Sequence, residues 1–212
     1  MSLSTTALHG LHEELGGRLV DFAGWELPVQ FAGIIAEHQH TRKSVSLFDV
    51  SHMGQVLIYP ESGNLADAAA ALETLIPASV AGLKEGRQRY GLFTDENGGV
   101  LDDLMFANHG DHYFLVVNAA RSDHDLGLLR TLERVTVEHI TDRSLLALQG
   151  PRAEEALAGL IPDAAGLRFM DSRVLDWDGV TVWVSRSGYT GEDGFEISVP
   201  SAEAERLAHM GI

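Results

Sequence analysis

Residues 89–118 read RYGLFTDENGGVLDDLMFANHGDHYFLVVN, and this stretch decides the fold class of the chain. Its three apolar runs are separated by the short segments DENGG and NHGD, which are rich in Gly, Asn and Asp. Such segments form tight turns, so we expect three antiparallel strands in meander order. Asp102 and Asp103 stand side by side in the middle strand, although a carboxylate taken out of water costs several kcal/mol unless a partner compensates it.

The two acids are expected to point to opposite faces, because side chains alternate along a strand. Asp102 falls on the face of Leu104 and Phe106, so only one acid of the pair is expected to face a shared pocket. A catalytic role is one interpretation. The other is structural, with one acid solvated and the other accepting backbone N–H bonds beside the Gly98–Gly99 turn. The pair alone leaves both interpretations open.

The composition narrows the class of protein. The chain has 212 residues, 45% of them hydrophobic, and 31 Asp and Glu residues against 15 Lys and Arg residues, for a net charge of -16. Such a charge repels polyanions, so we expect no nucleic-acid and no membrane partner. Cysteine is absent, which excludes disulfides and thiolate metal sites in this sequence. The sequence shows no signal-peptide pattern and no long apolar run, and we predict a cytoplasmic protein.

Helical and strand patterns alternate along the rest of the chain and predict an α+β fold with antiparallel sheets flanked by helices. The predicted helices cover residues 32–45, 65–76 after an Asn64 cap, 121–133, 151–161 and the segment from Ser201. The further predicted strands cover residues 54–59, 134–140, 145–149, a hairpin at 174–184 around Asp178-Gly179, and 195–199.

Metal and nucleotide sites gain little support. The pairs His38/His40 and His109/His112 lack the spacing of zinc ligands, so we predict no metal. Neither a Walker phosphate loop nor a strand followed by G-x-G-x-x-G occurs in the sequence.

The stretch SGYTGEDGFE, residues 187–196, is more informative. Its glycines let a ligand approach the main chain closely. Phe195, Ile197 and Val199 share one face of the following strand, which leaves Glu196 on the other face. That carboxylate could accept two hydrogen bonds from an amino-pyrimidine, or it could be an ordinary solvent-facing glutamate. Trp25 and Tyr90 could likewise stack on a ring or belong to the core.

Six motifs carry a resemblance to a known family. They are DFAGWELPVQF (21–31), EHQHTRKSVSLFDVSHMGQ (37–55), GGVLDDLM (98–105), LVVNAA (115–120), ALQGP (147–151) and SRSGYTGEDGFEISVP (185–200). In this order and at this spacing, they resemble the aminomethyltransferase, or T-protein, of the glycine cleavage system. The resemblance spans nearly the whole chain.

The resemblance implies a transferase of one-carbon metabolism and glycine catabolism. Such an enzyme passes the one-carbon unit of an aminomethyl group from the lipoylated H-protein to tetrahydrofolate and releases ammonia, without a metal. Asp102 matches the acid that the family treats as essential, and Glu196 matches its pterin-binding glutamate. Four further residues match positions that line the family's folate cavity. They are Met53, Tyr90, Asn118 and Tyr189.

The family fold is a three-domain cloverleaf whose first domain is interrupted by the second. Applied here, residues 1–48 and 144–212 form the folate-binding domain, 49–143 form the inserted domain, and the third domain and a later folate-holding arginine are absent. We therefore expect weaker folate binding from this chain. Two alternatives remain open. One is a folate-binding relative that does not transfer aminomethyl groups, of the iron-sulfur assembly type, and the other is a noncatalytic interaction fragment.

Overall fold

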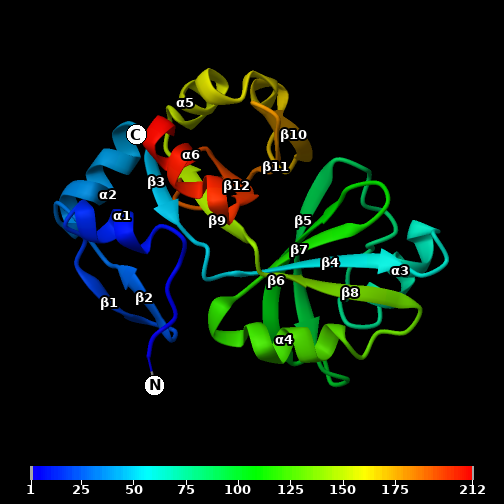
Figure 1. The fold of residues 1–212 in the computed structure, drawn as a ribbon. Coiled ribbons are helices and arrows are strands. Elements are labelled where there is room, and N and C mark those ends of the chain that lie inside the picture. The colour runs from blue at the N-terminus through cyan, green and yellow to red at the C-terminus, as the bar shows by residue number, and fades with distance from the viewer. Residues whose placement is uncertain (1, 212) are drawn as a thin grey trace. The chain divides into compact units, whose positions relative to one another are not determined.

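The computed structural model describes residues 2–211 and divides the chain into two compact units, each with its own core. The first unit runs to His52 and also takes Asp142–Phe169 and the segment from Val174 onward. The second unit takes Met53–Thr141 and Met170–Arg173. Figure 1 shows the fold of each unit as a ribbon.

The second unit is built on a five-stranded antiparallel sheet in the order β5-β6-β7-β4-β8. Its strands are β4 (Gly54–Pro60), β5 (Arg87–Thr94), β6 (Val100–Asn108), β7 (Tyr113–Val117) and β8 (Val135–Ile140). Neighbours β5, β6 and β7 confirm the predicted meander. Helices α3 (Leu65–Leu72) and α4 (Ser122–Leu129) contribute to one apolar core with the sheet.

The helices of this unit are shorter than predicted. Asn64 caps α3 as expected, since its side chain accepts a hydrogen bond from the Ala66 N–H. The helix ends at Leu72 rather than at residue 76, and turns follow. Pro77 keeps the chain from continuing as a helix past residue 76, because proline disfavours helical geometry in the residue before it. Helix α4 starts at Ser122, after a 3-10 turn at Ala119–Arg121.

The first unit is built on a second five-stranded antiparallel sheet, in the order β10-β11-β12-β9-β3, and on a separate hairpin, β1-β2. Its strands are β1 (Leu19–Phe22), β2 (Trp25–Pro28), β3 (Ser46–Asp49), β9 (Arg143–Gln149), β10 (Ser172–Trp177), β11 (Val180–Arg186) and β12 (Gly194–Pro200). Its helices are α1 (His9–Glu14), α2 (Ile34–Lys43), α5 (Ala153–Leu160) and α6 (Ala204–Gly211).

The sequence predicts one of the two hairpin turns of this unit and not the other. The predicted β10-β11 turn is confirmed, with φ of 51° at Asp178 and 81° at Gly179. Helix α1 and the β1-β2 hairpin were not predicted. The β1-β2 turn places Ala23 at φ 54°, a conformation that a side chain disfavours. The Gly24 N–H donates to Asp21 Oδ1 at 3.0 Å and stabilises that turn.

Helix α2 lies where it was predicted, but its apolar residues do not face a core. Ile34 and Ile35 are 62% and 68% exposed, whereas Thr41 is buried. The buried position follows from a polar contact, since Thr41 Oγ1 lies 2.7 Å from Ser46 Oγ at the start of β3. Glu37 closes the first turn by accepting from the Gly33 N–H at 2.7 Å.

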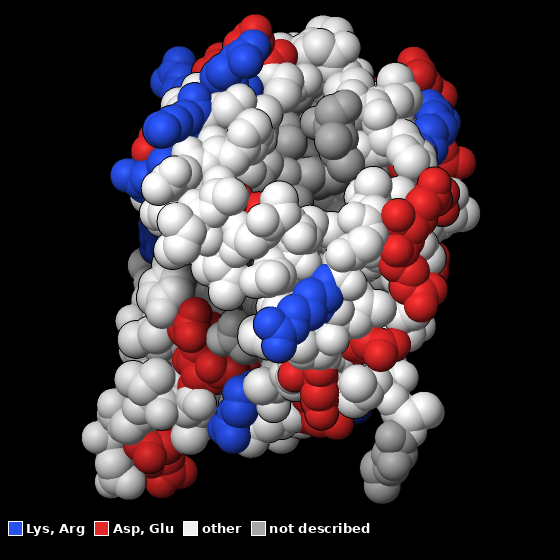
Figure 2. Space-filling view, turned by 90° about the vertical axis from the view of Figure 1, so that its left-hand side faces the viewer, with Lys and Arg blue, Asp and Glu red and all other residues white. Residues whose placement is uncertain are grey.

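The surface carries both acidic and basic side chains, in a chain with 31 Asp and Glu residues against 15 Lys and Arg residues. In Figure 2, acidic side chains form several separate groups on the face shown, and basic side chains lie among them. Within residues 2–211, no helix is long and apolar enough to cross a membrane.

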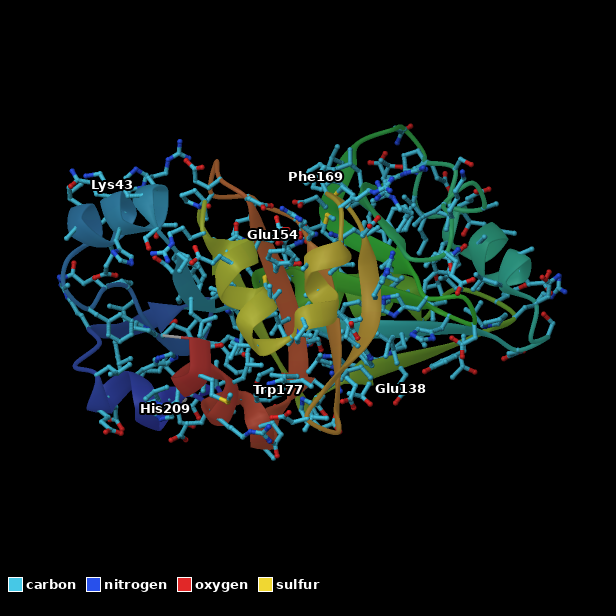
Figure 3. All side chains as sticks on the ribbon, turned by 90° about the horizontal axis from the view of Figure 1, so that it is seen from above. Lys43, Glu138, Glu154, Phe169, Trp177 and His209 are labelled. Carbon is cyan, nitrogen blue, oxygen red and sulfur yellow. The ribbon has the colours of Figure 1, made fainter. Side chains whose placement is uncertain are left out.

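Trp177, labelled in Figure 3, is buried at the end of β10, and the Arg206 guanidinium stacks 4.2 Å from the centre of its ring.

Candidate functional site

The acid pair of the second unit is held by a single amide. Asn118 follows β7, and its Nδ2 group donates to Asp102 Oδ1 at 3.1 Å, to Asp103 Oδ1 at 3.2 Å and to the Asp103 carbonyl at 3.2 Å. Asp102 pairs with the buried Phe93, whereas Asp103 lies beside the exposed Tyr90, as alternation along the strand predicts. One amide orients both carboxylates.

A β-bulge lies directly before the acid pair. Phe93 pairs with Asp102, but the next residue, Thr94, pairs with Val100, so Leu101 is an extra residue in β6. Such a bulge bends and twists a strand and redirects its side chains. The two acids lie directly after it, and their carboxylates reach the same side chain at the end of β7.

Asp102 keeps one oxygen without a protein partner. Asp102 Oδ2 is buried and accepts no hydrogen bond from any described residue. Buried polar atoms are nearly always bonded, so an orphan acceptor of this kind is expected where a ligand or a proton completes the site. Asn118 therefore fixes one carboxylate oxygen of Asp102 and leaves the other available.

Asp125, which sequence reasoning missed, is a further member of this cluster. It lies in the first turn of α4, fully buried, with Oδ1 at 3.1 Å from His124 Nδ1. Burial raises the pKa of Asp125 to about 6; a hydrogen bond with His124 lowers it, and the neighbouring Asp102 raises it again. A carboxylate among apolar residues of a helix was the available signal, since Leu126 and Leu129 beside it are buried.

Tyr90 joins the cluster from the outer face of β5. Its side chain is 53% exposed, and its phenol lies close enough to Asp103 to hydrogen-bond. Loss of solvent first, and then the charge of Asp103, raise the pKa of Tyr90. The ring is thus a flat, accessible surface beside the acid pair.

Gly54, the first residue of β4, lets α4 approach the sheet. A Cβ atom at Gly54 would lie 2.6 Å from Val117 Cγ2 and 2.8 Å from Ser122 Oγ. Only a glycine leaves space there for the start of α4, the helix that carries Asp125. Met53, the residue before it, is part of the turn between β3 and β4 and is half-buried.

Glu196 is the main feature of the first unit. As predicted, Phe195, Ile197 and Val199 point into the core. Glu196 pairs with Ala147 of β9 and with Ser185 of β11, two small residues that leave space beside its carboxylate. Burial raises its pKa to about 7, and no described side chain or N–H group donates to it. The half-buried carboxylate is therefore an unused acceptor.

Gln149, in the ALQGP motif, holds the loop that carries Tyr189. It is fully buried, and its Oε1 atom accepts from the Tyr189 N–H at 3.1 Å and from Thr190 Oγ1 at 3.4 Å. Tyr189 itself is 55% exposed. Loss of solvent around its hydroxyl, and then the charge of Glu196, raise its pKa. Tyr189 and Glu196 therefore belong to one local constellation.

The same loop closes tightly on itself and on α2. A Cβ atom at Gly188 would lie 2.0 Å from the Glu192 carbonyl oxygen, so no side chain fits there. Arg42 of α2 donates to the Thr190 carbonyl at 3.0 Å and pairs with Glu192 at 3.2 Å. These contacts give a glycine-rich loop a defined conformation.

A buried hydrogen-bond cluster around Asp49 supports the DVSHM motif and was also missed. Asp49 Oδ2 accepts from Thr6 Oγ1 at 2.6 Å and lies 2.9 Å from His12 Nε2. Burial opposes ionisation of Asp49, but hydrogen bonds from His12, Ser51 and Thr6 outweigh it and lower its pKa. All its oxygens are used, which indicates a structural role.

The remaining histidines form no metal centre in the part of the chain that the structure describes, where no three His, Cys, Asp or Glu side chains converge. His109 and His112 are ring neighbours, with centroids 5.2 Å apart. Burial, followed by the charge of His112, lowers the pKa of His109 to about 4.

The predicted site residues fall into two clusters. Asp102, Asn118 and Tyr90 lie together in the second unit, with Asp103 and Asp125 added by the structure. Glu196 and Tyr189 lie together in the first unit. Among the described residues, no hydrogen bond or ion pair joins Met53 to either cluster.

Comparison with known proteins gives consistent results. The family described as GCVT N-terminal domain matches residues 8–210. A mitochondrial aminomethyltransferase of Dictyostelium discoideum is 41% identical, with 98% of this chain and 54% of that protein aligned. An aminomethyltransferase of Rubrobacter xylanophilus is 43% identical over 97% of this chain and 55% of that protein.

The structural comparison points the same way. The crystal structure of glycine cleavage system aminomethyltransferase T from Bartonella henselae superimposes with a TM-score of 0.88 at 36% identity, covering 99% of this chain and 57% of that one. A heterotetrameric sarcosine oxidase from Corynebacterium shares the fold at 20% identity and a TM-score of 0.54. The chain spans about half the length of the curated relatives that it matches.

Proposed function

Because this chain belongs to the GCVT N-terminal domain family, we propose that it is the N-terminal part of an aminomethyltransferase of the glycine cleavage system. The proposed reaction takes the aminomethyl group carried by the lipoylated H-protein, transfers its one-carbon unit to tetrahydrofolate and releases ammonia. The discontinuous first unit is the proposed folate-binding domain, and the second unit is the inserted domain.

The observation that carries the proposal is the state of Asp102. One of its oxygens is fixed by Asn118, and the other is buried without a donor among the described residues. A folate amine N–H is the kind of donor that this oxygen lacks. The residues present therefore fit the proposed substrate, since a donor from the ligand would complete an otherwise unsatisfied acceptor.

Asp102 has two proposed tasks in the transfer. Attack by a folate nitrogen on an electrophilic carbon places positive charge on that nitrogen, and a preorganised carboxylate offsets this charge at little cost in reorganisation. The same carboxylate is placed to accept the proton that the nitrogen then loses. Tyr90, beside the acid pair, offers a flat surface for the folate, and Asn118 keeps Asp102 oriented.

Glu196 is the proposed pterin-binding residue. An ionised carboxylate accepts two hydrogen bonds and suits the paired N–H donors of an amino-pyrimidine. The small neighbours Ala147 and Ser185 leave room for that contact, and Tyr189 supplies an exposed aromatic ring nearby. Met53 is proposed to contact folate through its thioether and side-chain carbons.

Two measurements on the chain test the proposal. The first is calorimetric titration with tetrahydrofolate, and the second is ammonia release from aminomethyl-loaded, lipoylated H-protein. Asp102→Asn is expected to keep folate binding and to lower ammonia release by on the order of 10²-fold or more, because it removes the charge but not the shape. Asp95→Asn, in the turn before β6, is the matched control and is expected to leave both unchanged.

The outcomes separate the alternatives. Folate binding without ammonia release from the loaded carrier would favour a folate-binding relative that does not transfer aminomethyl groups. No response to folate would favour a noncatalytic interaction fragment. Normal binding with near-normal ammonia release by Asp102→Asn would refute the assigned role of Asp102.

A further inference from the structure

Asp125 is a buried acid that the proposed reaction leaves without a task. Its side chain is 0% exposed, and Oδ1 contacts His124 Nδ1 at 3.1 Å. Its second oxygen, Oδ2, is buried without a donor among the described residues, and so is Asp102 Oδ2. The two carboxyl groups lie close enough to hydrogen-bond to each other. The orphan atoms of the acid cluster thus belong to two neighbouring acids.

In the chain without folate, a proton shared by the two carboxyl groups is the simplest partner for both orphan oxygens. Two ionised carboxylates only accept hydrogen bonds, so a bond between them exists only when one of them is protonated. When both are ionised their charges repel, as in other carboxyl pairs that share one proton. The start of α4 and the Nδ2 group of Asn118 partly offset that repulsion.

The proton is held more tightly by Asp125 than an ordinary aspartate would hold it. The titratable groups that act on it are His124, next to it on α4, and Asp102, from β6. Burial and Asp102 raise the pKa of Asp125, His124 lowers it, and the result is about 6. Asp125 therefore takes up its proton at a higher pH than an ordinary aspartate, near pH 6.

We propose that Asp102 and Asp125 act as one proton acceptor, in which Asp125 is a positioning residue that shares the proton received by Asp102. This rests on the proposed function of Asp102. In the transfer, an N–H bond of the folate amine breaks, the nitrogen keeps the electron pair, and an O–H bond forms on Asp102. The proton then lies between the two carboxyl groups until the departing ammonia takes it.

Nuclear magnetic resonance without folate tests the shared proton, so its result does not depend on whether the chain binds folate. The side-chain amide of Asn118 is the probe, because it contacts Asp102 but not Asp125. In the unmodified chain, its signals are expected to shift between pH 4 and 8 with a midpoint near 6. Asp125→Asn is expected to abolish that step, since it leaves Asp102 with a permanent neutral neighbour.

Two further variants make the test decisive. In His124→Gln the step should persist and move to higher pH, because His124 lowers the pKa of Asp125. In Asp102→Asn the carboxyl carbon of Asp125, followed by ¹³C labelling, should titrate at a lower pH than in the unmodified chain. If Asp125→Asn fails to fold, the titration of Asp125 in Asp102→Asn still tests whether the two carboxyl groups share a proton.

The proposal is overturned if Asn118 shows no step near pH 6, if the step survives Asp125→Asn, or if Asp125 titrates at the same pH with and without the Asp102 carboxylate. A buried acid with a purely structural role would not transmit its titration to Asn118. Failure of folate binding with these titrations intact would instead count against the proposed function alone.

Discussion

Replacing Glu196 by Gln should stabilise the first unit at high pH and weaken folate binding. Glu196 is half-buried on β12 and receives no hydrogen bond from the described residues. Its ionised form is therefore poorly solvated in the folded chain. Gln has nearly the same shape and no charge, so the substitution removes this penalty and keeps the packing.

The size of the effect follows from the pKa of Glu196, which burial raises from 4.5 to about 7. At 1.36 kcal/mol for each pKa unit, this difference amounts to about 3 kcal/mol. The folded chain binds the proton more tightly than the unfolded chain. Its advantage is complete below about pH 4.5 and is lost as the pH rises through about 7. Relative to the wild type, Glu196→Gln should therefore gain nothing near pH 4.5 and about 3 kcal/mol by pH 8.

Urea unfolding followed by tryptophan fluorescence measures this directly. All three tryptophans, Trp25, Trp177 and Trp183, belong to the first unit, so the signal reports on the unit that carries Glu196. Midpoints and slopes are compared at pH 5 and pH 8. Glu14→Gln, an exposed position on α1, is the matched control and should show no pH-dependent gain.

The loss in folate affinity is the second half of the prediction. A hydrogen bond to a charged group is worth about 1.5–3 kcal/mol, so Glu196→Gln should weaken tetrahydrofolate binding by roughly 10- to 100-fold. A stability difference that is the same at both pH values would refute the reasoning from burial. A pH-dependent gain with unchanged folate affinity would keep that reasoning and reject the pterin-binding role.

Two other substitutions test how the clusters are built. Gly54→Ala should lower the free energy of unfolding by about 1–3 kcal/mol, because its Cβ would clash with Ser122. Urea unfolding followed by circular dichroism measures this loss. The control is Gly127→Ala on α4, where a Cβ meets nothing within 4 Å, and it should be neutral or stabilising. Gln149→Leu should speed hydrogen exchange of the Tyr189 amide by about 10-fold or more, since that N–H loses its acceptor. An unchanged exchange rate would contradict the conclusion that Gln149 holds the loop of Tyr189.

Local chemistry in the sequence was sufficient for much of the fold. The Asp178-Gly179 turn and the glycine-rich turns of the meander gave the antiparallel pairing, and Asn64 gave a helix start. The β1-β2 hairpin escaped because its turn places Ala23, not a glycine, at positive φ. The exposure of the apolar residues on α2 was not predicted, because a polar contact of Thr41, rather than apolar periodicity, sets which face is buried.

At the acid cluster, the sequence could not predict which residues come together. Alternation along a strand predicts that neighbouring acids separate, and this is sound for a regular strand. Asp102 and Asp103 do pair in regular register with Phe93 and Leu92, but nothing in the letters GGVLDDLM identifies the extra residue Leu101 just before them. Asp125 comes from another element, 23 positions later, and only the packing of α4 brings it to Asp102. Contacts between distant elements decide this site, so the sequence pattern alone could nominate Asp102 but not its partner.

The buried and half-buried acids Asp49, Asp125 and Glu196 differ in how fully they are hydrogen-bonded, and this difference separates a structural role from the proposed functional ones. Asp49 is buried with three donors, and its pKa is lowered, as expected of an acid that stabilises the fold. Asp125 and Glu196 keep unused oxygens, and burial raises the pKa of each toward neutrality. An acid of the second kind costs stability whenever it is ionised, so its presence is best explained by a ligand or a proton that it receives during function.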